Sequence, residues 1–172
     1  MQQRHKLIVM RHAKAGELPG GPDFERALRP RGRRDSAAAG RWLAASKLRP
    51  DLVLCSAARR TRQTWQHLSA ALEAAEAGAG PAFLADRRLY EAASEDVLDV
   101  LREAGGDAEI VLYIGHNPAA AGVVGQLTGS EPASFPTAAI AVLAVAGDWA
   151  DLGPGEGELL ASWTPRDAGQ AT

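Results

Sequence analysis

Short apolar runs alternate with longer segments of helical composition along most of this chain. The apolar runs lie near residues 6–10, 51–55 and 109–114, and amphipathic segments lie at 32–47 and 57–77. This alternation is typical of a mainly parallel sheet with helices on its faces. We therefore expect an α/β fold, a three-layer α/β/α sandwich around a mainly parallel central sheet with helices on both faces.

The second half of the chain continues the pattern and ends in two strands. The expected elements are a short strand, two helices and two strands joined as a hairpin, at 83–85, 94–104, 118–127, 138–145 and 158–163. We find no repeat, linker or second domain in the sequence. The prediction is one domain over 1–172, with a core of about 6–164 and flexible ends.

Composition excludes several classes of function. With 172 residues, 46% hydrophobic and 23% charged, the chain has enough apolar material for one domain with a full core. The 19 basic and 21 acidic residues give a formal net charge of -2. No global field therefore favours nucleic acid or an anionic membrane, and any anion site must be local.

The compartment follows from what the sequence contains. Cys55 is the one cysteine, so it cannot form an internal disulfide, and its apolar neighbours predict a small buried strand residue. No apolar run approaches the roughly 20 residues of a membrane span. The start, Met1–Lys6, is polar with no signal-peptide core behind it. We expect a cytoplasmic protein with no membrane partner.

Two of the expected strands end in a histidine, His12 directly after Arg11 and His116 after the strand at 109–114. The carboxyl ends of parallel strands open into the crevice where α/β sheets bind ligands, so we expect one shared site. A neutral imidazole attacks phosphorus through one free nitrogen while an acceptor, commonly a backbone carbonyl, holds the other as N–H. His12 fits such a nucleophile, although an isolated Arg-His pair is more often a solvated turn.

A third segment carries three arginines at the start of a helix. The strand at 51–55 breaks at Ser56, and Arg59, Arg60 and Arg62 follow in the first helical turn. Cations there oppose the helix dipole, so an oxyanion partner would explain them. Solvated surface arginines are the alternative, which we expect to hold for at least one of Arg59 and Arg62.

Together these residues resemble the histidine phosphatase superfamily, which also contains the cofactor-dependent phosphoglycerate mutases. Arg11-His12, the segment 56–64 with Arg60 in register, and Gly115-His116 match its three principal motifs in order. The closest resemblance is to the small SixA-type phosphohistidine phosphatases. Larger relatives that act on sugar phosphates carry a long insertion, whereas only residues 65–88 intervene here.

The resemblance implies a division of labour among these side chains. His12 would become phosphorylated, while Arg11, Arg60 and His116 hold the phosphoryl oxygens without a metal or cofactor. Fixed cations and N–H donors stabilise the charge that spreads over those oxygens in the transition state. Nearby arginines would also lower the pKa of His12 and keep it neutral for attack.

The resemblance also implies roles for three further residues. Arg26 matches a basic position near the phosphate of SixA-type proteins, with an ordinary turn arginine as the alternative. Asn117, in the same motif as His116, is counted among the phosphate-binding residues. Glu91 falls where many superfamily members place the general acid, which poor leaving groups need most.

Departures from the family pattern concern smaller features. Ala13 replaces a common glycine after the histidine, Thr61 stands where alanine is frequent, and Lys14 adds a charge without an assigned role.

The sequence thus predicts a metal-independent phosphatase with no nucleic-acid partner. The favoured substrate is phosphohistidine on a protein, for example a histidine-phosphorylated phosphotransfer domain, because a short connection leaves no large lid. A small-molecule phosphomonoesterase acting on sugar or nucleotide phosphates is the alternative within the same chemistry. A non-catalytic phosphate-binding or phosphoprotein-binding module is the alternative from another class, and a nucleotide-binding regulator lacks the Gly-rich loop that it requires.

Overall fold

A six-stranded sheet in the order β3-β2-β4-β1-β5-β6 forms the middle of the computed structural model, which describes residues 5–169. The strands are β1 (His5–Arg11), β2 (Leu52–Ser56), β3 (Ala82–Asp86), β4 (Ile110–Gly115), β5 (Ile140–Val145) and β6 (Gly157–Trp163). Strands β3, β2, β4 and β1 are parallel, whereas β5 runs antiparallel to both β1 and β6. The mainly parallel sheet and the final hairpin predicted from the sequence are confirmed.

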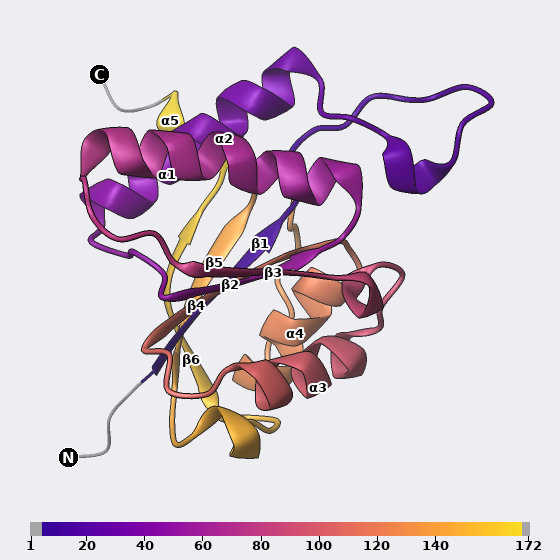
Figure 1. Cartoon of the computed structure of the whole chain (residues 1–172). Coiled ribbons are helices and arrows are strands. Elements are labelled where there is room, and N and C mark those ends of the chain that lie inside the picture. The colour runs from indigo at the N-terminus through magenta and orange to yellow at the C-terminus, as the bar shows by residue number, and fades with distance from the viewer. Residues whose placement is uncertain (1–4, 170–172) are drawn as a thin grey trace.

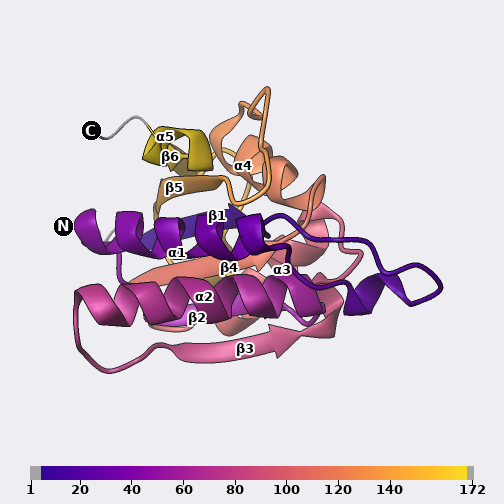
Figure 2. The ribbon, with the colours of Figure 1, turned by 90° about the horizontal axis from the view of Figure 1, so that it is seen from above.

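Helices cover both faces of this sheet (Figure 1). They are α1 (Pro30–Ala45), α2 (Arg59–Ala75), α3 (Ser94–Ala104), α4 (Ala119–Thr128) and α5 (Pro165–Ala168), with 3-10 turns η1 (Asp23–Glu25), η2 (Arg87–Leu89) and η3 (Trp149–Asp151). Helices α1 and α2 lie side by side on one face and α3 and α4 on the other, as the view from above also shows (Figure 2). The predicted three-layer α/β/α sandwich is confirmed.

Alternation along the buried strands divides the core into two clusters. In β1, Leu7 and Val9 pack with α3 and α4, whereas Ile8 and Met10 pack with α1 and α2. Successive side chains of a strand point to opposite faces, so a strand covered on both sides is apolar throughout. Full burial of each such side chain contributes about 1.5–3 kcal/mol, which fixes the register of β1 against its neighbours.

Two small residues support this arrangement. A Cβ at Gly40 of α1 would lie 2.3 Å from the Leu68 carbonyl oxygen of α2, so the two helices approach too closely there for a larger residue. Cys55 is fully buried in β2 and unpaired, and burial raises the pKa of its thiol to about 12. A thiol held protonated is a poor nucleophile, which agrees with its predicted packing role.

The boundaries differ from the prediction where the backbone turns. Strand β5 begins at Ile140 rather than Ala138, because Ala138 has φ 63° and cannot continue an extended strand. Helix α4 begins at Ala119, one residue after Pro118. The predicted flexible ends include residues 1–4 and 170–172, which lie outside the described residues. No helix within residues 5–169 is long and apolar enough to cross a membrane.

Candidate active site

The register of β1 against β4 brings the two strand-end histidines together. Arg11 pairs with Gly115, and the backbone N–H of His12 donates to the Gly115 carbonyl at 2.9 Å. His12 and His116 therefore follow at the same level, with ring centroids 5.2 Å apart. The structure thus brings both histidines together at the carboxyl edge of the sheet, and their joint role in an active site stays a prediction.

The ring of His12 is held in one tautomer. Its Nδ1 lies 2.8 Å from the carbonyl oxygen of Ala13. A carbonyl only accepts, so Nδ1 carries the proton and Nε2 keeps its lone pair. The N–H of Ala138, in its left-handed conformation, donates to the His12 carbonyl at 3.0 Å and fixes the backbone as well. This is the geometry that a neutral imidazole nucleophile requires.

Burial is the main reason that His12 is neutral. The side chain is 8% exposed, and removal from water lowers its pKa to about 3, with smaller contributions from His116, Arg60 and Arg11. The arginines named in the sequence analysis do lower the pKa of His12, but burial, which the sequence analysis did not name, is the larger cause. At this buried edge of the sheet, the loss of water around a charged imidazolium costs more free energy than the repulsion from neighbouring charged side chains, which solvent partly screens.

His116 has partners at both ring nitrogens. Its Nε2 lies 2.8 Å from the Ser56 hydroxyl, and its Nδ1 lies 3.3 Å from Nη2 of Arg60. Because a guanidinium only donates, Nδ1 accepts and Nε2–H donates to Ser56. Burial, and then Arg60, lower the pKa of His116 to about 4. The hydrogen bond from His116 to a phosphoryl oxygen stays a prediction, and it would require a change of tautomer if Nδ1 were the donor.

Gly115 permits a close approach at the end of β4. A Cβ at this position would overlap the hydroxyl of Tyr113 from the same strand. The missing Cβ thus leaves room for the ring of Tyr113, which is fully buried. The glycine therefore has a steric role at the strand end.

The turn from β2 into α2 delivers one of three arginines to the site. Arg60 is 5% exposed, whereas Arg59 and Arg62 are exposed to solvent. The hydroxyl of Thr61 donates to the carbonyls of Ser56 and Ala58 at 2.7 and 2.8 Å and closes the turn. The expectation of a solvated role for at least one of Arg59 and Arg62 is confirmed, and Thr61 in place of alanine adds a structural contact.

Arg60 is bound by a residue that the sequence analysis did not single out. Asp23 of η1 accepts from Nη2 of Arg60 through Oδ2 at 3.0 Å, and its backbone carbonyl accepts from Nη1 at 2.9 Å. The Tyr90 hydroxyl donates to Oδ2 at 2.7 Å, and Nε of Arg26 donates to Oδ1 at 2.8 Å. The Tyr90 ring also meets His116 edge to face, with centroids 5.7 Å apart. Asp23 thus joins three side chains, those of Arg60, Tyr90 and Arg26, at the mouth of the site.

The available signal for this cluster was weak. Asp23 lies three residues before Arg26, a spacing compatible with a local ion pair, but nothing in the sequence connects it to Arg60. Arg26 also donates to the Gly16 carbonyl at 3.1 Å, which secures the loop between β1 and α1. Its predicted phosphate contact stays a prediction.

Arg11 and Asn117 share one backbone acceptor. Nη1 of Arg11 donates to the Phe135 carbonyl at 3.2 Å, and the Asn117 amide donates to the same oxygen at 2.8 Å. The Asn117 carbonyl accepts from the N–H of Ala121 at 3.3 Å. Asn117 therefore has a structural role here, as a link between the 130–137 loop and α4, and its predicted phosphate contact is untested.

Glu91, a predicted site residue, and Lys14, whose charge has no assigned role, both lie at the surface. Glu91 is exposed, has φ 57° and makes no hydrogen bond or ion pair within the described chain, although its charge contributes to a raised pKa of the neighbouring Tyr90. Its role as a general acid stays a prediction. Lys14 is exposed, and its carbonyl accepts from the N–H of Arg29 at the start of α1.

Beside the two histidines, one buried guanidinium nitrogen of each neighbouring arginine lacks a partner in the described part of the chain. Nε of Arg11 and Nε of Arg60 are enclosed and make no hydrogen bond within residues 5–169. An unpaired buried donor is costly unless a ligand satisfies it. The two arginines next to the histidines therefore keep unused capacity for an anion.

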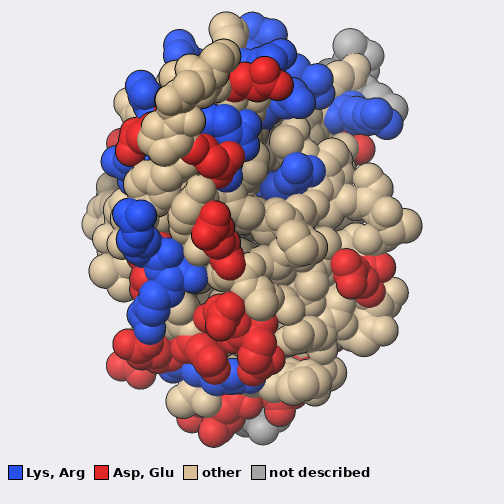
Figure 3. Space-filling view, turned by 90° about the vertical axis from the view of Figure 1, so that its right-hand side faces the viewer, with Lys and Arg blue, Asp and Glu red and all other residues tan. Residues whose placement is uncertain are grey.

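Charge on the surface is consistent with a local anion site. The side of the molecule that carries η1 shows Lys and Arg mainly in its upper part, with acidic residues among them, and acidic residues mainly below (Figure 3).

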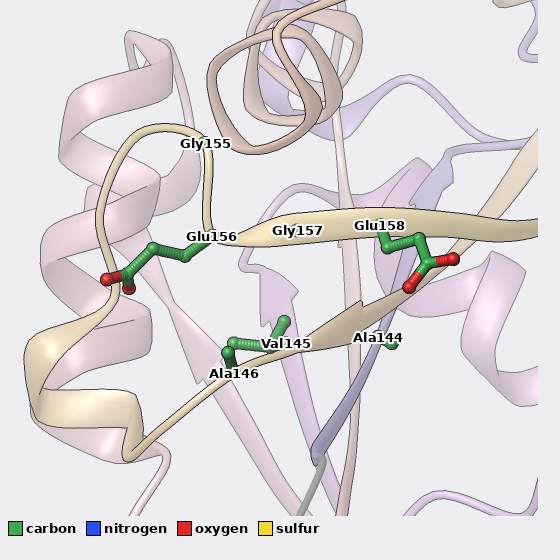
Figure 4. Close-up of a pocket in the computed structure, with 7 residues that line it drawn as sticks. All are labelled: Ala144, Val145, Ala146, Gly155, Glu156, Gly157 and Glu158. Carbon is green, nitrogen blue, oxygen red and sulfur yellow. The ribbon is translucent and has the colours of Figure 1, made fainter.

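A pocket of about 300 Å³ at the turn between β5 and β6 is lined by Glu156 and Glu158 together with small residues (Figure 4). It lies at the opposite end of β5 from Ile140, which pairs with Met10 beside His12. Two carboxylates at the far end of the sheet do not suit a phosphoryl group.

Known proteins share these motifs and this fold. The model of the histidine phosphatase superfamily, branch 1, matches residues 7–84. A Nakamurella multipartitia protein assigned as a phosphohistidine phosphatase SixA is 30% identical, with a TM-score of 0.81 over 94% of this chain and 96% of that chain. This chain belongs to branch 1 of the histidine phosphatase superfamily. The resemblance seen in the sequence is confirmed.

Other relatives of this histidine phosphatase superfamily member extend the comparison. A protein histidine phosphatase SixA solved with tungstate is 25% identical, with a TM-score of 0.79 over 94% of this chain and 98% of that chain. An uncharacterized protein of Mycobacterium tuberculosis is 40% identical over 167 residues, which cover 91% of this chain and 100% of that protein. The structural similarity is therefore to SixA, and the sequence relatives name no substrate.

Proposed function

We propose that this protein is a phosphatase that works through a covalent phosphohistidine at His12. The observation that carries the proposal is the contact of 2.8 Å between Nδ1 of His12 and the Ala13 carbonyl. It leaves Nε2 unprotonated on a ring whose pKa is lowered to about 3, so the nucleophile is ready at neutral pH.

The first step transfers the phosphoryl group to this nitrogen. Nε2 forms a bond to phosphorus while the bond from phosphorus to the leaving nitrogen or oxygen breaks, and the leaving group takes a proton from solvent water or, for an oxygen leaving group, from protonated Glu91. Arg11 and Arg60 offer their unpaired Nε–H groups and their charge to the phosphoryl oxygens. Stabilisation of charge on those oxygens by fixed cations is the main contribution that a protein makes to such transfers.

The second step returns the enzyme to its starting state. Water attacks phosphorus, the bond to Nε2 breaks, and the lone pair returns to the imidazole. Burial disfavours an imidazolium at this position and therefore favours release of the phosphoryl group from a ring that leaves neutral. No metal or cofactor enters either step of this proposal.

The favoured substrate is phosphohistidine on a protein. The connection between the second motif and Glu91 consists of α2, β3 and η2, without the long insertion typical of sugar-phosphate enzymes of the superfamily. An imidazole leaving group needs little acid assistance, which suits a site whose carboxylate candidate, Glu91, is exposed and unpaired. The SixA proteins among the similar structures support the same class.

A labelled phosphodonor tests the chemistry. After incubation and quenching, we expect an acid-labile, base-stable adduct on the wild-type protein and none on His12→Asn. His67→Asn is the matched control, because His67 lies part-buried on α2, outside the site. The proposal is overturned if neither an adduct nor turnover occurs with any of several donors.

The substrate class needs a separate comparison. We expect a larger kcat/KM on a histidine-phosphorylated phosphotransfer domain than on sugar or nucleotide phosphates. The reverse order would identify a small-molecule phosphomonoesterase with the same intermediate. Phosphate binding without turnover would instead indicate a binding module.

A further inference from the structure

The carboxylate of Asp23 binds Arg60, one of the cations that the proposed function places on the phosphoryl oxygens. Nη2 of Arg60 faces Oδ2 of Asp23 at 3.0 Å, and the second oxygen of the same carboxylate binds Arg26 at 2.8 Å. Both arginines are among the residues predicted to hold phosphate. A guanidinium binds carboxylate and phosphoryl oxygens through the same pair of N–H directions.

Asp23 is held as an anion in this position. Hydrogen bonds from Tyr90 and Arg26 and the charge of Arg60 keep the pKa of its carboxyl well below the usual range. A phosphoryl group that approaches Arg60 therefore meets a fixed negative charge. Two negative groups in contact with one guanidinium repel each other strongly near a protein surface. The carboxylate and the phosphoryl group therefore compete for Arg60.

The two partners differ in how firmly they are placed. The side chain of Arg60 is 6% exposed, whereas that of Asp23 is 51% exposed on a loop that leaves the body of the molecule (Figure 2). When the carboxylate turns toward water, solvent replaces the hydrogen bonds that it loses from Tyr90 and Arg26. Displacement of Arg60 would leave a buried cation without a partner.

We propose that the Asp23 carboxylate is an internal anion that holds Arg60 in the free enzyme and is displaced when a phosphoryl group binds. This inference rests on the proposed function, because it takes the phosphoryl group to bind Arg60. It makes Asp23 a residue that sets the affinity for phosphate without contact with the reacting atoms.

The backbone contact of Asp23 makes it possible to test whether its carboxylate competes with phosphate or only positions Arg60. The contact of 2.9 Å between Nη1 of Arg60 and the Asp23 carbonyl does not involve the side chain. Asp23→Asn therefore removes the negative charge while the backbone still holds the guanidinium in place. Under the proposal this change strengthens phosphate binding, whereas a purely positioning carboxylate predicts that it weakens binding.

Calorimetric titration with inorganic phosphate at neutral pH distinguishes these signs. We expect Asp23→Asn to bind phosphate about tenfold more tightly than wild type, since one unfavourable charge contact is removed. The matched control is Asp99→Asn on α3, where a 67% exposed aspartate accepts from Arg102 at 2.7 Å. Its affinity should equal that of wild type.

Equal or weaker binding by Asp23→Asn overturns the inference, as does the absence of phosphate binding in all three proteins. The phosphohistidine adduct at His12 is measured separately and decides whether the proposed function fails as well. A crystal of the wild-type protein soaked in tungstate supplies a second measurement that needs no variant. A tungstate oxygen on Nη2 of Arg60 with Asp23 turned away supports displacement, and an intact ion pair beside bound tungstate contradicts it.

Discussion

Nε2 of His116 and the hydroxyl oxygen of Ser56 lie 2.8 Å apart at the ends of neighbouring parallel strands. Ser56 also accepts from the N–H of Ala58 at 3.3 Å, so its own proton is free to turn toward the imidazole. A hydroxyl can donate or accept. Ser56 can therefore support either tautomer of His116, including the one in which Nδ1–H faces a phosphoryl oxygen.

Removal of this hydroxyl should impair catalysis more than folding. We expect Ser56→Ala to lower kcat by about tenfold with a small change in KM, because His116 loses the partner that orients its ring. Ser36→Ala is the control, since Ser36 is equally buried and donates to the Gly32 carbonyl within α1. Steady-state kinetics and thermal unfolding of both variants test this, and equal kinetic effects would contradict it.

The bidentate capacity of Arg60 should be essential. Arg60→Lys keeps the charge but loses the planar pair of donors, so we expect kcat/KM to fall by about 10²- to 10³-fold. Arg59→Lys, in the same helical turn but exposed, should stay within about twofold of wild type. If both variants retain activity, Arg60 does not bind the transferred group.

Glu91 should matter according to the leaving group. We expect Glu91→Gln to slow hydrolysis of an alkyl phosphate by about tenfold and to change hydrolysis of phosphohistidine by less than about twofold, because an alkoxide needs a proton and an imidazole needs it less. Rates on both substrates provide the measurement. The exposed Glu95, which pairs with Arg102, supplies the control Glu95→Gln. Equal losses on the two substrates would contradict the general-acid role.

Acid should destabilise the fold through the two site histidines. Their pKa values are lowered from 6.5 to about 3 and about 4, so below pH 6.5 the unfolded chain binds more protons than the folded one. The free energy of unfolding therefore falls as the pH drops from about 6.5 toward 4, by up to roughly 1.4 kcal/mol per pH unit for each histidine. Above pH 7 this contribution is constant.

Urea unfolding at several pH values measures that slope. His12→Asn should make the dependence between pH 6 and 4.5 shallower by about one proton. The carboxyl of Asp23, whose pKa is lowered from 3.8, affects stability only at lower pH and does not mask the effect. A slope unchanged in His12→Asn would show that His12 titrates normally in the folded state.

Periodicity predicted the elements, and their order predicted the shared site. His12 and His116 were found because buried parallel strands must end at one edge. The helix dipole pointed to the group Arg59, Arg60 and Arg62, and the family motif singled out Arg60 among them. Both arguments depend on residues close together in the sequence. The weak prediction of a strand at 83–85 also held, as β3, although four of its five residues are exposed.

The loop between β1 and α1 could not be predicted in the same way. Asp23 and Tyr90 are 67 residues apart, and they meet only because η1 and the segment after β3 come together at the mouth of the site. Irregular segments carry no periodic signal, so their long-range partners stay hidden in a single sequence. The dominant influence of burial on the pKa of His12 was missed for a related reason, since solvent exposure follows from packing.

The register that pairs Arg11 with Gly115 determines whether the proposed site can form. A shift of β4 by one position along β1 would turn the His116 side chain to the other face of the sheet. The apolar side chains in the middle of those strands, which are buried on both faces, oppose that shift. We therefore expect substitutions deep in the core to abolish the proposed activity even when every residue at the mouth of the site is unchanged.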